Sequence, residues 1–258
     1  MPDAMSAAAP PPLWGQRPIA LERDALRRRI YAPVAYAPVR DAAVIPVVHT
    51  EAYQLAAWFP LVWRRRATEY DFVAVRALIN DQRAQPPVAR ALLPRILHAY
   101  PFVFDPAVPP SPDCSRMLDD VFADCPTDLG ATITTVNGRL SRATAMRLRT
   151  LDGLAEDYPP TRRIGQALAA LDLFLPWQLK FDIAGHIIEI PDLFIVRPDA
   201  FATGRFAPML EELGSSAALV LGLHRISIFR AGALLAMARK LLKQAPASAA
   251  DVKAGSAA

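Results

Sequence analysis

The chain has 258 residues, of which 53% are hydrophobic, and a formal net charge of +4 at pH 7. This much apolar material is ample for the core of one large domain. The small net charge and the scatter of the basic residues along the chain argue against a nucleic-acid-binding protein. Two cysteines, Cys114 and Cys125, are too few for a disulfide scaffold and lack the spacing of metal ligands.

Both ends of the chain are rich in alanine, and the first is also rich in proline. We expect disordered tails at residues 1–18 and 245–258 on either side of one domain at residues 19–244. The N-terminus has no basic segment followed by an apolar one, so the sequence predicts no secretory signal and a cytoplasmic location.

The first third of the domain alternates between extended and helical patterns. Residues 34–50, "VAYAPVRDAAVIPVVHT", favour an extended segment bent by its prolines. A short helix over residues 51–59 should follow, with Thr50 as its cap. Residues 60–66 and 71–78 then predict a pair of strands.

The middle of the chain carries several prolines at the expected ends of elements. Residues 86–100 have helical spacing, and Pro94 should divide them into two short pieces or kink them. Pro101 then predicts a strand with Phe102 and Phe104 on one face. Further on, Asn137-Gly138 is a strong turn dipeptide.

Three elements are expected in the last hundred residues. A helix should begin after Pro160, and residues 177–190 alternate as a hairpin with its turn at Ala184-Gly185. Helices should then occupy residues 208–213 and 216–242. The whole order predicts one α+β domain, with a mixed or antiparallel sheet, packed helices and a C-terminal apolar helix.

That C-terminal helix is long enough to span a bilayer, but His224, Arg225 and Arg230 lie near its middle. An arginine there would cost roughly 2.5 to 3.5 kcal/mol on insertion scales. We therefore expect no integral membrane segment and a helix that docks on the domain. Its docking stripe should consist of three apolar residues continued by two more positions at helical spacing: Leu219, Leu223, Ile226, Arg230 and Leu234.

No motif of a nucleotide-binding loop, a serine hydrolase or a zinc protease is present, so the sequence predicts no catalytic residue, no metal site and no cofactor. His49 follows the apolar run "VIPVV" at an expected strand end, where a functional side chain is well placed; a polar residue near a helix start is the alternative. Two charged groups are expected to be solvated faces: the acids Asp119, Asp120, Asp124 and Asp128, and the arginines Arg139, Arg142, Arg147 and Arg149.

The stretch "HAYPFVFD", residues 98–105, gathers His98 and three aromatic residues around Pro101. Tyr100 at such a helix-to-strand junction favours packing in the core, and the rim of a binding site is the alternative. We expect Tyr100 to be buried and His98 to lie nearer the surface.

Several stretches together resemble the bacterial SapC-like proteins. They are "PIALERDALRRR", "YAPVRDAAVIPVVHTEAYQLAAWFPLVW", "LPRILHAYPFVF", "LPWQLKFDI" and "LFIVRPDAF", and the likeness runs roughly from Pro18 to Leu242. The family name comes from a bacterial surface-layer locus, and the resemblance brings no catalytic residues with it.

Two functions are compatible with these observations. The first is a cytoplasmic, non-enzymatic binding or accessory protein that recognises a peptide or protein partner, with His49, His98 and Tyr100 as candidate binding residues. The second is an enzyme of unknown reaction, peptide- or small-molecule-modifying, whose site assembles from His49, His98 and an acid such as Asp105, since histidine titrates near neutrality.

Overall fold

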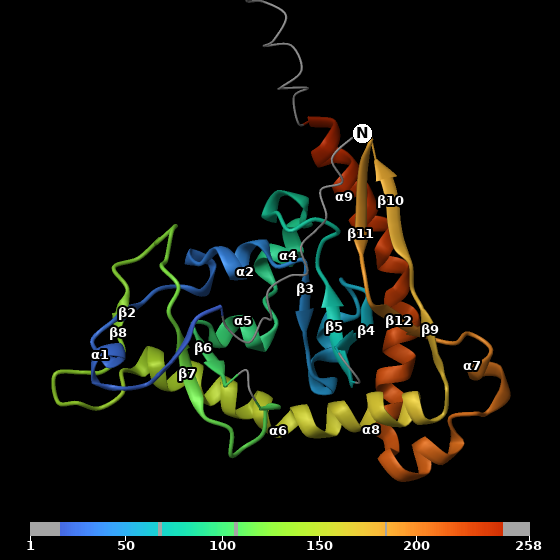
Figure 1. The fold of residues 1–258 in the computed structure, drawn as a ribbon, viewed down its shortest axis with the longest axis horizontal. Coiled ribbons are helices and arrows are strands. Elements are labelled where there is room, and N and C mark those ends of the chain that lie inside the picture. Colours follow the sequence, from blue (N-terminus) through green and yellow to red (C-terminus); the bar gives the residue numbers. More distant parts are fainter. Residues whose placement is uncertain (1–15, 67–68, 106–107, 184, 245–258) are drawn as a thin grey trace, which may run out of the picture.

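The computed structural model describes residues 16–244 apart from 67–68, 106–107 and 184. Helix α6 (Arg142–Ala170) runs along the base of the molecule, and the sheets and other helices rise from it (Figure 1). Small sheets lie over its first half, and a larger sheet with the C-terminal helices lies over its second half. The α+β fold class is confirmed, and every pair of named strands is antiparallel within the described residues.

The larger sheet has five strands. Their spatial order is β3 (Val44–Pro46), β5 (Glu69–Val75), β4 (Leu61–Arg66), β12 (Leu193–Val196) and β9 (Phe174–Pro176). The expected pairing of β4 with β5 is confirmed, with Trp63 opposite Phe72. Both of these aromatic residues are buried, as are Leu61 and Ala74, so one face of the pair packs against α6 and α8 (Ala207–Ser227).

The remaining strands form three smaller units. A three-stranded sheet has the order β1 (Pro18–Ala20), β7 (Arg116–Asp119) and β6 (Phe102–Phe104), and a two-stranded sheet joins β2 (Arg29–Ile30) to β8 (Ala131–Thr132). The predicted hairpin is confirmed as β10 (Leu179–Ile183) and β11 (His186–Ile190). Gly185 in its turn has φ of +81°, which a glycine adopts without strain; Ala184 lies outside the described residues.

Short helices connect the strands. They are α1 (Arg23–Leu26), η1 (Pro33–Ala35), α2 (Ala37–Asp41), η2 (His49–Glu51), α3 (Ala52–Leu55), η3 (Gln82–Ala84), α4 (Pro87–Ala91), α5 (Arg95–Ala99) and α7 (Ala200–Thr203). The division at Pro94 is confirmed by α4 and α5. The extended prediction for residues 34–50 was wrong over α2, because Pro38 lies in the first turn of that helix, where a fixed φ favours helix formation.

A fully buried arginine joins two of these helices to the larger sheet. Arg76 follows β5, and its guanidinium donates to the carbonyl oxygens of Val39 (3.1 Å), Ala42 (3.3 Å) and Ala89 (2.6 Å) and to Oε1 of Gln85 (2.9 Å). Three of these acceptors are carbonyls near the C-terminal ends of α2 and α4, where a cation is favoured. Burial alone lowers the pKa of Arg76 to about 10.

The prediction of a helix beginning after Pro160 was wrong. Helix α6 begins at Arg142, capped by Ser141, whose hydroxyl accepts a hydrogen bond from the N–H of Thr144. Pro159 and Pro160 lie inside the helix, although a proline in a helix interior costs about 3 kcal/mol.

Packing on both sides of the prolines explains why α6 continues. Leu151 and Leu154 belong to the core over the first half of the molecule, and Ile164 and Leu168 to the core over the second half. All four are buried. Burying one such side chain contributes roughly 1.5 to 3 kcal/mol, so the four together offset the loss at the prolines.

The C-terminal helices are α8, η4 (Ile228–Arg230) and α9 (Ala231–Gln244). The predicted docking stripe was wrong at Leu219, Ile226 and Arg230, which are exposed, whereas Leu223 is half-buried and Leu234 is buried as predicted. The docked face carries the buried residues Ala217, Val220, Leu221, His224, Ser227, Leu234 and Ala238. The buried His224 holds this face against the larger sheet, because it bonds to two of its strands. Its Nδ1 donates to Leu61 O (2.6 Å), and its Nε2 accepts from Val196 N–H (3.1 Å).

Candidate functional site

His49 is the first residue of a helical stretch formed by η2 and α3, directly after β3. Its backbone N–H donates to Thr161 Oγ1 (2.9 Å), and its ring Nδ1 lies 2.9 Å from the same oxygen. The Thr161 hydroxyl donates its one hydrogen to the Asp157 carbonyl (2.7 Å), so Nδ1 must carry the hydrogen of the neutral ring. Nε2 is then an acceptor, and no hydrogen bond to it is present among the described residues. Burial lowers the pKa of His49, which keeps the ring neutral near pH 7.

A network of charges lies beside His49. Arg95 donates to the hydroxyl of Thr50 (2.7 Å) and to the carboxylate of Asp157, which also accepts from Thr50 (2.6 Å). Burial would raise the pKa of Asp157, but the hydrogen bonds from Thr50 and Arg95 outweigh it and lower that pKa. The prediction of Thr50 as a helix cap was wrong, because the helical stretch already begins at His49 and the Thr50 hydroxyl bonds to Asp157.

Glu51 lies beneath this network and is buried. Its carboxylate accepts from the backbone N–H groups of Arg95 (2.7 Å) and Val48 (3.2 Å), which fixes α5 to the start of η2. Burial raises the pKa of Glu51, partly offset by these hydrogen bonds and the charge of Arg95. Glu51 therefore positions the backbone around His49 and does not face solvent.

Two aromatic side chains are exposed near His49 in the sequence: Tyr53 lies within α3, and Trp58 lies in the turn that follows it. Tyr53 is 77% exposed and Trp58 is 48% exposed. Tyr53 lies four residues after His49, so the two side chains share one face of the stretch. The face that His49 shares with Tyr53 thus combines an exposed aromatic ring with an Nε2 that accepts no hydrogen bond from the described residues, and Trp58 adds a second exposed ring further along the chain. We call Tyr53, Trp58 and His49 the aromatic surface.

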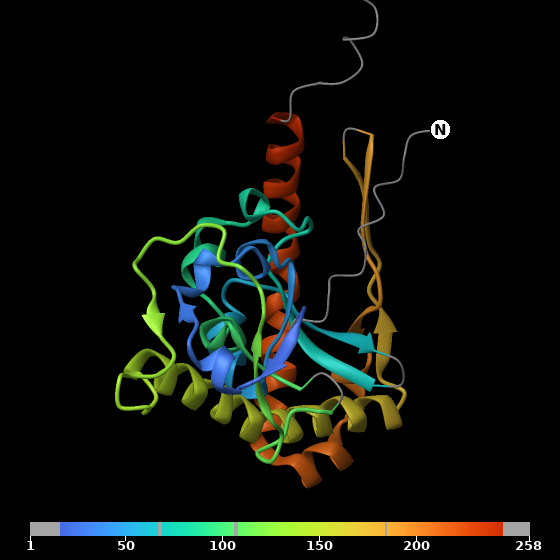
Figure 2. The ribbon, with the colours of Figure 1, turned by 60° about the vertical axis from the view of Figure 1, so that its left-hand side comes forward.

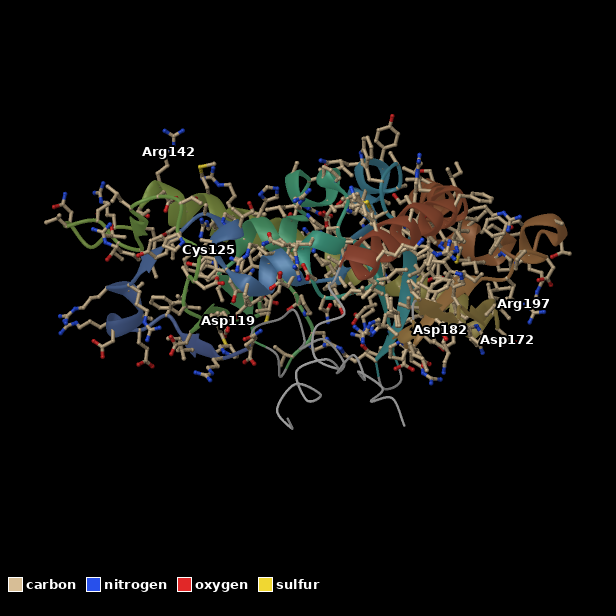
Figure 3. The ribbon with its side chains drawn as sticks, turned by 90° about the horizontal axis from the view of Figure 1, so that it is seen from above. Asp119, Cys125, Arg142, Asp172, Asp182 and Arg197 are labelled. Carbon is tan, nitrogen blue, oxygen red and sulfur yellow. The ribbon has the colours of Figure 1, made fainter. Side chains whose placement is uncertain are left out.

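Tyr100 has a structural position. Its side chain is 4% exposed and packs edge-on against Tyr36 with 5.0 Å between ring centroids. Its hydroxyl donates to Asp119, and burial raises the pKa of Tyr100 far above its usual value. The prediction that Tyr100 is buried is confirmed. The prediction of Asp119 in a solvated acidic face was wrong, because this carboxylate is buried. Figure 3 labels Asp119.

His98 is exposed at the end of α5, as expected. Partial burial of its ring and the charge of Arg147 lower the pKa of His98. Arg147 donates to the carbonyl oxygens of Tyr100 (2.9 Å) and Tyr31, so this member of the arginine group is not a solvated side chain.

The structure does not bring the three candidate residues to one place. His49 bonds to Thr161, whereas the carbonyl of Tyr100 bonds to Arg147, and these two residues of α6 are fourteen positions apart. At 1.5 Å per residue this corresponds to about 21 Å along the helix axis. An apolar void of about 10 Å³ lies between β3, α5 and α6 and has room for one water molecule at most.

Sequence reasoning missed Arg95, Asp157, Thr161 and Tyr53. The spacing of His49 and Tyr53 in "HTEAY" was available as a signal once the helix was extended back to His49. Asp157 and Thr161 are also four residues apart, but the expected break at Pro160 assigned them to different elements. One wrong helix boundary therefore hid the neighbours of the best-placed histidine.

Comparison with known proteins places the chain in a family. Neither the curated proteins nor the solved structures include a match to it. The model of one protein family, described as SapC, matches residues 27–211, which is more than two thirds of the chain. The matched region includes the aromatic surface, Tyr100 and all of α6, and it ends within α8. The chain therefore belongs to the SapC family.

Proposed function

We propose that this SapC-family protein is a cytoplasmic binding or accessory protein that recognises a peptide or protein partner through the aromatic surface. The observation that carries the proposal is the exposure of Tyr53 on the face of His49 and of Trp58 in the turn after α3. Tyrosine and tryptophan supply much of the binding energy at protein interfaces, since each buries a large area and also offers a hydrogen-bonding group. Tyr53, which is held on a helix, loses little entropy on binding.

The polar side chains next to this pair favour a peptide-like partner. The acceptor Nε2 of His49 suits a backbone N–H or a hydroxyl of the partner. Arg95 and Asp157 already neutralise each other, so the surface offers hydrogen bonds and apolar contact more than net charge. Glu51 and Thr161 hold the backbone and ring of His49 in place before binding.

Capture from a native lysate, followed by affinity measurement with the recovered partner, tests the proposal. The double variant Tyr53→Ser/Trp58→Ser should lose the partner that the wild type recovers, because each hot-spot residue contributes about 2 kcal/mol or more, or about 30-fold in affinity. Phe122→Ser is the matched control, since Phe122 is 88% exposed in the loop after β7. Equal recovery by the wild type and the double variant would contradict the proposal.

An enzymatic function is the second candidate, and one observation favours it. The Nδ1–H of His49 is held by Thr161, which leaves Nε2 as a fixed base. His98 is not joined to this histidine by any hydrogen bond among the described residues. His49→Gln separates the two functions: an enzyme would lose turnover completely, whereas a binding protein with Tyr53 and Trp58 intact would keep most of its affinity.

A further inference from the structure

The C-terminal helices present an apolar stripe on the side that faces away from the protein. It consists of Leu219, Gly222, Ile226, Phe229 and Ala233, which we call the outer stripe. All five are exposed, with Leu219 at 52%, Ile226 at 63% and Phe229 at 85%. At 100° per residue they fall within about 80° of one another on the helix. A helix on the surface of a soluble protein normally carries polar residues on its exposed face. An exposed apolar stripe of this kind marks a surface that contacts another molecule.

Basic side chains surround the outer stripe. Residues 215–244 contain no aspartate or glutamate and five basic residues, so this segment has a charge of +5, against +4 for the whole chain. All five are exposed, and no ion pair joins them to a carboxylate within the described part of the chain: Arg225, Arg230, Arg239, Lys240 and Lys243. Arg225 and Arg230 lie on opposite sides of the stripe at helical spacing. Apolar contact flanked by positive charge suits a surface that is apolar inside and anionic at its boundary.

A second copy of the chain does not fit this surface. Pairing of two outer stripes would bring Arg225 and Arg230 of both copies into one interface, with no acid in residues 215–244 to offset them, and like charges there oppose association. A peptide that docks in a groove or along a sheet edge also fits poorly, since the outer stripe is the ridge of a helix. A bilayer surface with anionic headgroups needs no groove.

We propose that the outer stripe docks on the surface of an anionic phospholipid bilayer, with the helix lying in the plane of the headgroups. The segment Ala207–Lys243 is long and apolar enough to cross a membrane by length and composition. Crossing would, however, separate His224 from Leu61 and Val196 and would expose the buried Leu234. Figure 2 shows α9 (red) rising above the body of the protein, and Leu234 and Ala238 pack with residues of the β10–β11 hairpin, so the opposite face of the helix is left to meet a flat surface.

Vesicle flotation with the full chain tests the proposal. The wild type should float with vesicles of phosphatidylcholine and phosphatidylglycerol in equal amounts and should not float with phosphatidylcholine alone. Raising the salt from about 0.1 M to about 1 M shortens the screening length from about 10 Å to about 3 Å and should release most of the protein. Equal flotation with both kinds of vesicle would overturn the proposal.

Two pairs of matched variants separate apolar from charged contributions. Phe229→Ser should abolish flotation, whereas Phe122→Ser, which changes an equally exposed phenylalanine elsewhere, should not. Arg225→Gln/Arg230→Gln should weaken binding about fivefold for each charge removed. The control Arg139→Gln/Arg142→Gln should leave binding unchanged; Figure 3 shows Arg142 at the far end of the molecule from α8 and α9. If Phe229→Ser fails to fold, the arginine pair still decides.

Three other results would overturn the proposal. Protein that stays with the vesicles after alkaline carbonate extraction would indicate a helix that spans the bilayer. A dimer of the wild type in the absence of lipid that becomes a monomer in Phe229→Ser would show that a second copy covers the outer stripe. A captured protein that binds the wild type but not Phe229→Ser, with no flotation of either, would assign the stripe to a protein partner.

Discussion

The hydroxyl of Tyr100 donates a 2.6 Å hydrogen bond to Oδ2 of Asp119, while Oδ1 of the same carboxylate accepts from the backbone N–H groups of Gln16 (2.9 Å) and Arg17 (2.7 Å). One buried carboxylate thus joins the end of α5 to β7 and to the chain entering β1. The ordered structure therefore begins before residue 19, where the domain was expected to start. The rest of the expected tails, residues 1–15 and 245–258, lies outside the described residues.

Tyr100→Ala should lower the free energy of unfolding by about 3 to 5 kcal/mol, because it leaves a cavity beside Tyr36 and removes a donor from a buried carboxylate. Tyr100→Phe should lose about 1 to 3 kcal/mol, since it removes the donor alone. His98→Ala is the control and should melt like the wild type, because His98 is exposed. Melting curves of the three variants check this; an unchanged Tyr100→Ala would show that the ring does not support the core.

Acidification should destabilise the protein through His224. Burial lowers the pKa of this histidine to about 4, whereas the unfolded chain takes up the proton near pH 6.5. Between these values the unfolded state binds more protons, so the free energy of unfolding falls as the pH falls, by about 3 kcal/mol in all. Burial also lowers the pKa of His49 and of His98, which act in the same direction, while the raised pKa of Glu51 acts in the opposite one.

The histidine responsible can be identified from variants. Denaturant unfolding between about pH 7 and about pH 4.5 should give a flatter dependence for His224→Gln than for the wild type. His186→Gln, which changes an exposed histidine of β11, should keep the slope of the wild type. If His224→Gln keeps it as well, the buried ring does not control acid stability.

Arg76→Met should destabilise the protein by about 3 to 5 kcal/mol, although methionine fills a similar volume and removes a buried charge. The reason is that four acceptor groups, on Val39, Ala42, Gln85 and Ala89, lose their donor at once. Arg83→Met changes an exposed arginine that bonds to Asp81 and should have little effect. Thermal melts of both variants compare the two sites directly.

Truncation after Gly214 should give insoluble or unfolded protein. It removes His224 from Leu61 and Val196, and it uncovers the apolar cluster that contains Leu234 and Ala238. Removal of residues 245–258 is the control and should leave melting unchanged. Soluble truncated protein with a cooperative transition would show that the C-terminal helices are an appendage.

The sequence predicted those parts of the fold where local signals agree. The β10–β11 hairpin, the β4–β5 pair and the division at Pro94 each combine an alternating or helical pattern with a turn or a proline. The pattern failed where contacts distant in sequence decide the outcome. Pro159 and Pro160 indicated a helix end, but apolar residues on both sides of them pack into two cores that a local pattern does not reveal.

The docked face of the C-terminal helix is a second case in which the local sequence pattern did not predict which residues are buried. Leu219, Leu223 and Ile226 are the more apolar choice, yet hydrogen bonds from His224 to two strands turn the opposite side inward. Periodicity identifies an amphipathic helix but does not say which of two apolar faces is buried. His49 was identified because it follows an apolar run that predicted a strand; its neighbours come from α5 and α6, whose positions only the fold defines.

The passage of α6 through both cores limits how this protein can be divided. A fragment that ends within the helix would deprive one core of Leu151 and Leu154 or the other of Ile164 and Leu168. We expect neither half of the protein to fold as a separate module. A break at any point along α6 leaves each of the two resulting fragments without part of a core. We expect one cooperative unfolding transition, and we expect proteins of this family to vary at their ends and loops in preference to the length of α6.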